Sequence, residues 1–139
     1  MCIRDRFFTT QLLFDSVAAR DVLRQYDLLC RQASIPPAAV VLSVAPIADD
    51  QDAEFVRWLG ADLPESAERA ILGAEESDAA RRSVEIAVSV WESVAAMARD
   101  ELLAVPIGVN VEQISARHLA VAGELLNTVA SRIDAAPGL

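Results

Sequence analysis

The 139-residue sequence contains no lysine, because all twelve of its basic residues are arginine. This absence excludes enzymes that form a Schiff base on a lysine and nucleotide-binding proteins that use a P-loop lysine. Cysteine is almost as scarce: Cys2 and Cys30 occur alone, and neither belongs to a CxxC or cysteine/histidine motif. A disulfide framework and a structural zinc site are therefore excluded, and a reducing, cytoplasmic location is expected.

Long apolar runs and an excess of positive charge are also missing. The longest uncharged apolar run, residues 38–48, is about half of the roughly 20 residues that a membrane-spanning helix needs, and Pro46 interrupts it. The net charge of -9 disfavours binding to nucleic acid or to an anionic membrane surface. Because 53% of the residues are apolar, the chain has enough core residues for about one globular domain.

The apolar residues form three short runs and several longer helical patterns. Buried strands are expected at residues 7–13, 39–44 and 106–110. Helices are expected at 16–33, 50–59, 64–72, 78–103 and 115–133, with Ser77 and Ser115 as the N-caps of the last two. Each strand is separated from the next by at least one helix, which requires parallel strands joined by crossovers. The predicted fold class is therefore α/β, with three parallel strands and crossover helices.

Three strands do not close a barrel, and they leave two edges and one face of the sheet open. Leu12, Val41 and Val109 are expected on that open face, which predicts self-association into a homo-oligomer. Residues 1–6 place three charges directly before two phenylalanines and resemble translated adapter sequence. We interpret them as a non-native scar, and residues 7–139 as part of a larger domain.

Functional groups in parallel α/β folds gather at the carboxyl ends of the strands. Gln11, in the first strand, either bonds to neighbouring backbone or reads a ligand with a lactam edge. Gln51 and Phe55 are four residues apart and share a helix face, where Phe55 is either a core residue or a ring beside a ligand-binding amide. Asn110, at the end of the third strand, is either a turn residue or a ligand-binding residue.

The other polar groups carry no recognisable catalytic pattern. The carboxylates of Asp49, Asp50, Asp52 and Glu54 are interpreted as a helix cap and a solvated first turn. His118 is interpreted as a residue on a helix surface, because no serine, cysteine or second histidine accompanies it. No metal site, nucleophile elbow or glycine-rich phosphate loop is predicted.

Four segments carry a resemblance to a known family. Segment 8–15 (FTTQLLFD) resembles the Thr-Gln strand of the methylenetetrahydrofolate reductases, and segment 40–47 (VVLSVAPI) resembles the barrel strand that follows it. Segments 59–64 (LGADLP) and 108–110 (GVN) resemble a later helix break and the last strand. The resemblance covers residues 7–126 and implies strands six to eight, the carboxyl-terminal part of a (β/α)8 TIM barrel.

Carried over residue by residue, the resemblance implies that Gln11, Gln51 and Phe55 bind a folate and that Asn110 contributes to the same site. It implies no catalytic residue and no cofactor-binding residue in this sequence, because the family's catalytic glutamate and most of its flavin contacts lie on the five earlier strands. One departure is clear. Family members commonly have an arginine directly after the asparagine of the last strand, whereas Val111 and Glu112 follow Asn110 here.

The function that the resemblance implies is reduction of 5,10-methylenetetrahydrofolate to 5-methyltetrahydrofolate, with NAD(P)H as donor and FAD as cofactor. The 139-residue chain by itself is expected to bind no flavin and to be inactive. Two alternatives remain open at this stage. One is a non-enzymatic half-barrel or helical interaction module that uses the stripe of residues 78–103, and the other is a different TIM-barrel enzyme of one-carbon metabolism.

Overall fold

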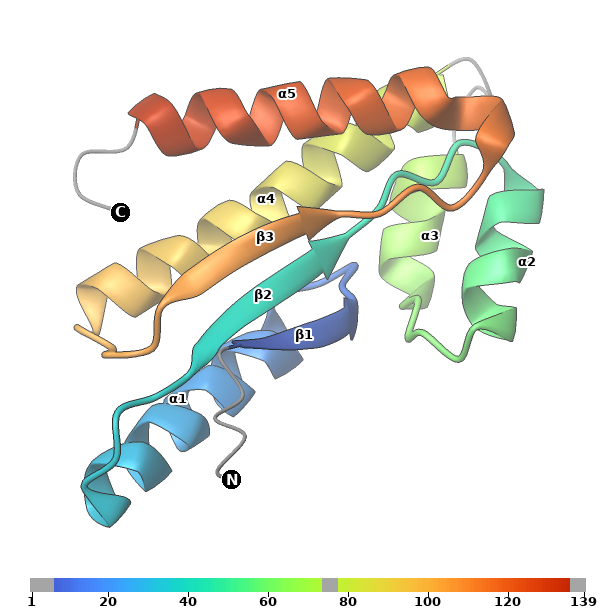
Figure 1. The fold of residues 1–139 in the computed structure, drawn as a ribbon. Coiled ribbons are helices and arrows are strands. Elements are labelled where there is room, and N and C mark those ends of the chain that lie inside the picture. The colour runs from blue at the N-terminus through green and yellow to red at the C-terminus, as the bar shows by residue number, and fades with distance from the viewer. Residues whose placement is uncertain (1–6, 74–77, 136–139) are drawn as a thin grey trace, which may run out of the picture.

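A computed structural model describes residues 7–73 and 78–135, so the interpretation of residues 1–6 and the predicted cap at Ser77 lie outside the described residues. Strands and helices alternate along the chain as expected (Figure 1). The elements are β1 (Phe7–Leu12), α1 (Val17–Ala33), β2 (Ala39–Val44), α2 (Asp50–Trp58), α3 (Glu65–Leu72), α4 (Ala79–Asp100), β3 (Ile107–Val111), the 3-10 helix η2 (Ala116–His118) and α5 (Leu119–Ala135).

The three strands form one parallel sheet in the order β1-β2-β3. Helix α1 connects β1 to β2, and α2, α3 and α4 connect β2 to β3, which confirms the predicted α/β class with crossover helices. The register between β2 and β3 is regular and pairs Val41 with Gly108 and Ser43 with Asn110. Between β1 and β2 the register shifts after Thr9, and the Thr10 hydroxyl accepts a hydrogen bond from the Ser43 amide at 2.9 Å where the strand ladder is interrupted.

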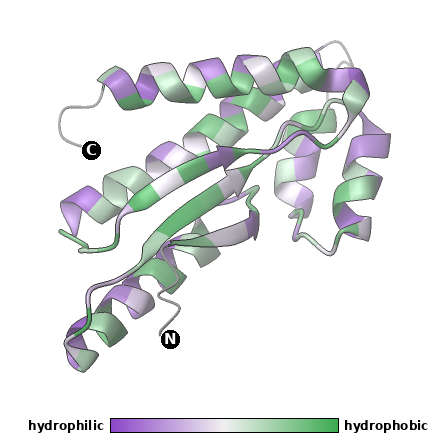
Figure 2. Cartoon of the chain, viewed as in Figure 1, coloured by the Kyte–Doolittle hydropathy of each residue, from purple (hydrophilic) through white to green (hydrophobic). Residues whose placement is uncertain are grey.

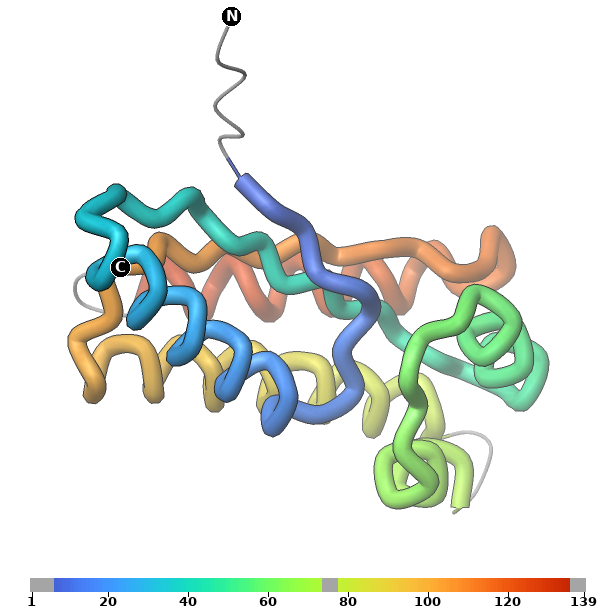
Figure 3. Tube along the Cα trace, turned by 90° about the horizontal axis from the view of Figure 1, so that it is seen from below, coloured from blue at the N-terminus to red at the C-terminus, as the bar shows by residue number. Residues whose placement is uncertain are grey.

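One face of the sheet packs against helices. Alternate residues of two strands, Val40, Leu42 and Val44 in β2 and Ile107, Val109 and Val111 in β3, belong to a core formed with α1, α4 and α5. Figure 3 shows α1 and α4 together on one side of the sheet, and Figure 2 shows β2 apolar along most of its length. Within residues 7–73 and 78–135, no helix lies across the opposite face, which we call the open face.

A second core lies at the carboxyl ends of the strands. There the end of β1 and the segment after β2 pack on α2, α3 and the start of α4, through side chains that include Phe14, Ile47, Val56 and Ile71. Figure 1 shows α2 and α3 at the end to which the strand arrows point. This second core holds α2 beside the open face of the sheet.

Three expectations about apolar residues were wrong. Strand β1 is not buried on both faces, since Phe7 and Phe8 are exposed. The reason is that β1 is an edge strand, which pairs with β2 alone among the described strands. Val109 faces the helices and not the open face, and Leu12 is buried in the second core. Neighbouring residues of a strand point to opposite faces, so the position of a residue along its strand decides which face its side chain joins.

The long helix is shorter than its apolar pattern predicted. Helix α4 ends at Asp100, and Leu102 adopts a left-handed conformation with φ of 53°. The Leu103 amide donates to the Ala98 carbonyl at 2.9 Å, as in a helix that closes on a left-handed residue. Leu102, expected on the buried stripe, is therefore exposed. Within the described residues, no helix is both long enough and apolar enough to cross a membrane.

Candidate functional site

The open face carries a polar group at the carboxyl end of the sheet. Ser43 in β2 and Asn110 in β3 are register partners, and the Asn110 amide nitrogen lies 3.5 Å from the Ser43 hydroxyl oxygen. The same nitrogen donates to the Glu112 carboxylate at 3.2 Å. Glu112 continues the alternation of the strand, because its backbone amide donates to the Val44 carbonyl at 2.8 Å. Ser43, Asn110 and Glu112 therefore point to the open face, opposite the helices.

The first turn of α2 adds two carboxylates with structural partners. Asp49 is the N-cap and its side chain accepts from the Asp52 amide at 2.8 Å, which confirms the predicted cap. Asp52 was expected in a solvated turn, but its side chain is 2% exposed and accepts from the Ala48 amide at 3.0 Å. The segment before α2 turns back over this side chain, and the backbone hydrogen bond offsets the cost of burying it.

The loop after β3 brings two basic residues onto these carboxylates. The Arg117 guanidinium lies 3.2 Å from Asp49 and 3.4 Å from Asp52, and it also donates to the side-chain oxygen of Gln51. His118 Nε2 lies 3.1 Å from the Asp49 carboxylate, so His118 is half-buried and not a simple surface residue as expected. These contacts tie the loops after β2 and β3 together beside the open face.

The charges around Asp49 have opposing effects on its pKa. Partial burial raises the pKa of this carboxyl, whereas the Asp52 amide, His118 and Arg117 lower it. Together, the three lowering effects outweigh the effect of burial, so the pKa of Asp49 lies below its ordinary value. Asp49 is therefore the anionic centre of a network of donors.

Asp49, Asp52 and His118 present three ligand atoms that lie within 4.8 Å of one another, an arrangement that resembles a metal site. The Arg117 guanidinium already contacts both carboxylates and supplies positive charge to them. Each carboxylate also accepts a backbone amide. A cation would have to displace Arg117, so the cluster is already satisfied by protein groups.

The predicted site residues lie toward the carboxyl end of the sheet, in β1, β3 and α2. Gln11 is exposed where the β1 ladder shifts, and its amide nitrogen lies 3.5 Å from the Leu59 carbonyl at the end of α2. Gln51 is exposed in the first turn of α2 and accepts from Arg117. Asn110 lies inside β3 and not in a turn. In the described parts of the chain, no hydrogen bond joins any two of these three residues.

Phe55 is not a core residue. Its ring is 40% exposed and stacks on Trp58, which is 78% exposed, at a centroid distance of 5.7 Å and an interplanar angle of 18°. An exposed aromatic pair beside polar side chains can stack on a planar ligand. This geometry fits the predicted role of Phe55, which stays a prediction.

Sequence reasoning missed four residues of this end of the sheet: Ser43, Glu112, Arg117 and Trp58. A signal for Glu112 was present, because Gly108, Asn110 and Glu112 alternate with apolar residues once the strand is extended past Asn110. Arg117 had no such signal, since its partners Asp49 and Gln51 lie more than sixty positions earlier in the chain.

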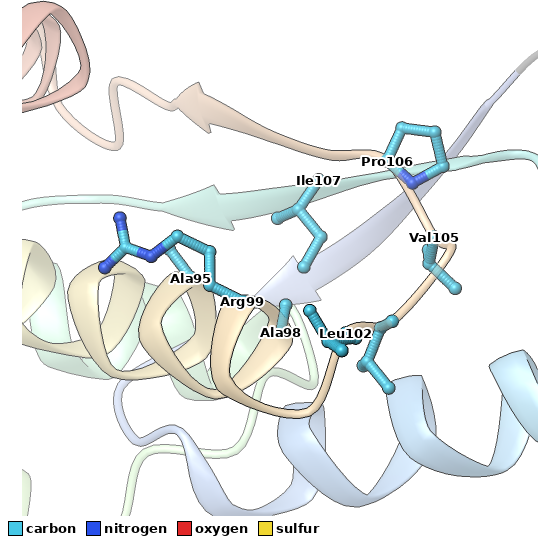
Figure 4. Close-up of a pocket in the computed structure, with 8 residues that line it drawn as sticks. Ala95, Ala98, Arg99, Leu102, Val105, Pro106 and Ile107 are labelled. Atoms are coloured by element: carbon cyan, nitrogen blue, oxygen red, sulfur yellow. The ribbon is translucent and has the colours of Figure 1, made fainter. Parts of the chain in front are cut away.

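A cavity of about 490 Å³ lies at the opposite end of the sheet, between the end of α4 and the start of β3. It is lined by apolar side chains such as Val105, Pro106 and Ile107, with Arg99 at its side (Figure 4). Ligands of parallel sheets bind at the carboxyl ends of the strands, and this cavity lies at the amino end of β3. It is therefore separate from the candidate site.

Comparisons with known proteins show a structure with a similar fold but identify no family for this chain. No protein-family model matches the chain, and no curated protein matches it. Among solved structures, the chain is similar to an uncharacterized protein from Clostridium thermocellum that binds two copies of 5-methyl-5,6,7,8-tetrahydrofolic acid. The TM-score is 0.74 at 24% sequence identity, and the match covers 91% of this chain. It covers 42% of that structure's chain, so this chain spans less than half of that protein.

Proposed function

We propose that this chain contributes to folate binding at the carboxyl end of its sheet. The observation that carries the proposal is the structural likeness, over 91% of the chain, to a protein that binds 5-methyl-5,6,7,8-tetrahydrofolic acid. The polar open face supports it, because Ser43, Asn110 and Glu112 lie where parallel sheets bind ligands. The proposal places the chain as the last three strands of a (β/α)8 barrel.

Helix α2 supplies the groups that a folate requires beside this face. The exposed Phe55–Trp58 stack offers a surface for a planar ring. The side-chain oxygen of Gln51 accepts from Arg117, so its amide nitrogen is the group that would donate to a ligand acceptor. Gln11, near the other end of α2, offers a second exposed amide.

The N-terminus of α2, beside the open face, does not fit FAD. Its pyrophosphate requires free backbone amides at a helix N-terminus, or free cations. The N-terminus of α2 is capped by Asp49, carries Asp50 and Asp52 in its first turn, and holds Arg117 in ion pairs. The same negative charge disfavours the phosphates of NAD(P)H. We therefore derive no hydride-transfer step, and methylenetetrahydrofolate reductase activity remains a proposal that rests on the sequence resemblance.

The test is titration of the purified chain with 5-methyltetrahydrofolate in a calorimeter. Saturable binding is expected, and Phe55→Ala should weaken it because the stacking ring is lost. Leu28→Ala, which removes an exposed apolar side chain on α1, serves as the matched control and should bind as the unmodified chain does. Absence of saturable binding up to the solubility limit of the ligand would overturn the proposal.

A parallel titration with FAD, monitored by flavin fluorescence, tests whether the chain binds this cofactor. No quenching is expected. If the chain instead binds FAD, the pyrophosphate argument is wrong and the reductase hypothesis gains direct support. Binding of neither compound would favour the alternative of a non-enzymatic module.

A further inference from the structure

Glu112 is a half-buried carboxylate on the open face. Its side chain accepts from the Asn110 amide at 3.2 Å, and it takes part in no ion pair among residues 7–73 and 78–135. By contrast, the nearby carboxylates Asp49 and Asp52 both contact Arg117. A carboxylate has about four lone-pair positions, so one amide donor leaves most of the acceptor capacity of Glu112 unused.

No helix among residues 7–73 and 78–135 lies across the open face on which Glu112 stands. Earlier on the same face of β3 lies Gly108, where an added Cβ would meet the Val41 side chain at 3.5 Å, an ordinary contact. Gly108 therefore adds no side chain to this face, and Ser43, the register partner of Asn110, is fully buried. In the proposal that follows, a planar heterocycle lies on this face with its edge toward Glu112.

We propose that the Glu112 carboxylate accepts two parallel hydrogen bonds from the ring N3–H and the 2-amino group of a 2-amino-4-oxo pterin. This inference rests on the proposed folate binding and names the group that reads the heterocycle. The pterin edge has the donor spacing of a guanidine, which a carboxylate binds in bidentate fashion. Asn110 acts as a positioning residue, because its amide holds one oxygen of Glu112 in place.

The first experiment measures the affinity for 5-methyltetrahydrofolate in Glu112→Gln, Glu112→Asp and the control Glu124→Gln. Glutamine keeps the shape of the side chain and its contact with Asn110, but it replaces one acceptor oxygen with a donor nitrogen. A charge-assisted hydrogen bond is worth about 1.5–3 kcal/mol, so Glu112→Gln should weaken binding about tenfold to a hundredfold. Glu112→Asp should recover part of the loss. Glu124 is exposed on α5, and its replacement should change nothing.

The second experiment uses a 5-methyltetrahydrofolate analogue with hydrogen in place of the 2-amino group. The unmodified chain should bind this analogue more weakly than the parent compound, and Glu112→Gln should lose less affinity on the same change, since the cycle isolates the pair. Equal losses in both proteins would overturn the role of Glu112 while leaving folate binding intact. Failure of the unmodified chain to bind the parent compound would instead overturn the proposed function. Circular dichroism of each variant checks that it is folded.

Discussion

At the scale of single residues, Asp52 is a buried polar side chain whose loss should lower stability. It is 2% exposed, and it is the acceptor for the buried Ala48 amide. Asp52→Ala leaves that amide without a partner, which costs about 1–3 kcal/mol of unfolding free energy. Asp52→Asn keeps an oxygen acceptor and should cost less. Urea unfolding measures both.

The control for this prediction is Asp62→Ala, which removes an exposed carboxylate from the loop after α2. A surface change of this kind should alter the unfolding free energy by no more than about 0.5 kcal/mol. If Asp52→Ala is as mild as Asp62→Ala, the burial and hydrogen bonding described for Asp52 are wrong.

Asp49 makes the stability of the chain depend on pH, and the direction of its pKa shift sets the sign of that dependence. Because the folded state lowers the pKa of this carboxyl, the stabilisation is fully present above the ordinary value of 3.8 and is lost as the pH falls through the lowered folded value. Asp49→Asn keeps an N-cap side chain but has no carboxyl to titrate. The loss of stability between about pH 5 and about pH 2.5 should therefore be smaller in Asp49→Asn, measured by urea unfolding at both pH values. An equal loss in both proteins would show that other carboxyls determine the acid response.

At the scale of elements, α5 is held by one face of the helix. Leu125 is fully buried in the core with α4 and the sheet, whereas its neighbour Leu126 is 55% exposed. Leu125→Ala should lower the unfolding free energy by about 2–5 kcal/mol because it removes core packing and leaves a cavity. Leu126→Ala should change it by about 0.5 kcal/mol or less. Similar unfolding midpoints for the two variants would contradict the orientation of α5.

Helix and strand positions could be predicted where apolar periodicity carries the signal. The pattern gave the end of α1 at Ala33 and the existence of every described strand. The end of α4 was missed because Leu102 adopts a left-handed conformation that normally favours glycine. The apolar pattern continues through Leu102, so a single sequence contains nothing that separates this ending from one more helical turn.

The candidate site was predictable only in part, for a different reason. The rule that ligands bind at the carboxyl ends of strands selected Gln51 and Asn110, and their role in binding stays a prediction. The contacts made by these residues depend on partners far away in the chain, such as Arg117 for Gln51. Local spacing carries no information about such pairs, and that is why Arg117 appeared only with the structure.

At the scale of the whole molecule, the sheet is unevenly protected. Its helix-covered face is closed by α1, α4 and α5, and the second core packs α2 and α3 against the ends of β1 and β2. Strand β1 is an edge strand, with Phe7 59% and Phe8 48% exposed. Backbone donors and acceptors on the free side of an edge strand are a template for pairing with another chain. The apolar side chains beside them add a hydrophobic contribution to that pairing.

We therefore expect the chain to self-associate through β1, with a larger apparent size on gel filtration as its concentration rises. Phe7→Lys should raise the dissociation constant by at least about tenfold, because it removes apolar contact area and places a charge on the edge. The matched control is Val22→Lys, which puts the same charge on an exposed apolar position of α1, away from the edge, and should leave the assembly unchanged. A chain that elutes as a monomer at every concentration would show that the exposed edge does not pair. Equal effects of the two substitutions would show that net charge, and not the β1 edge, controls association.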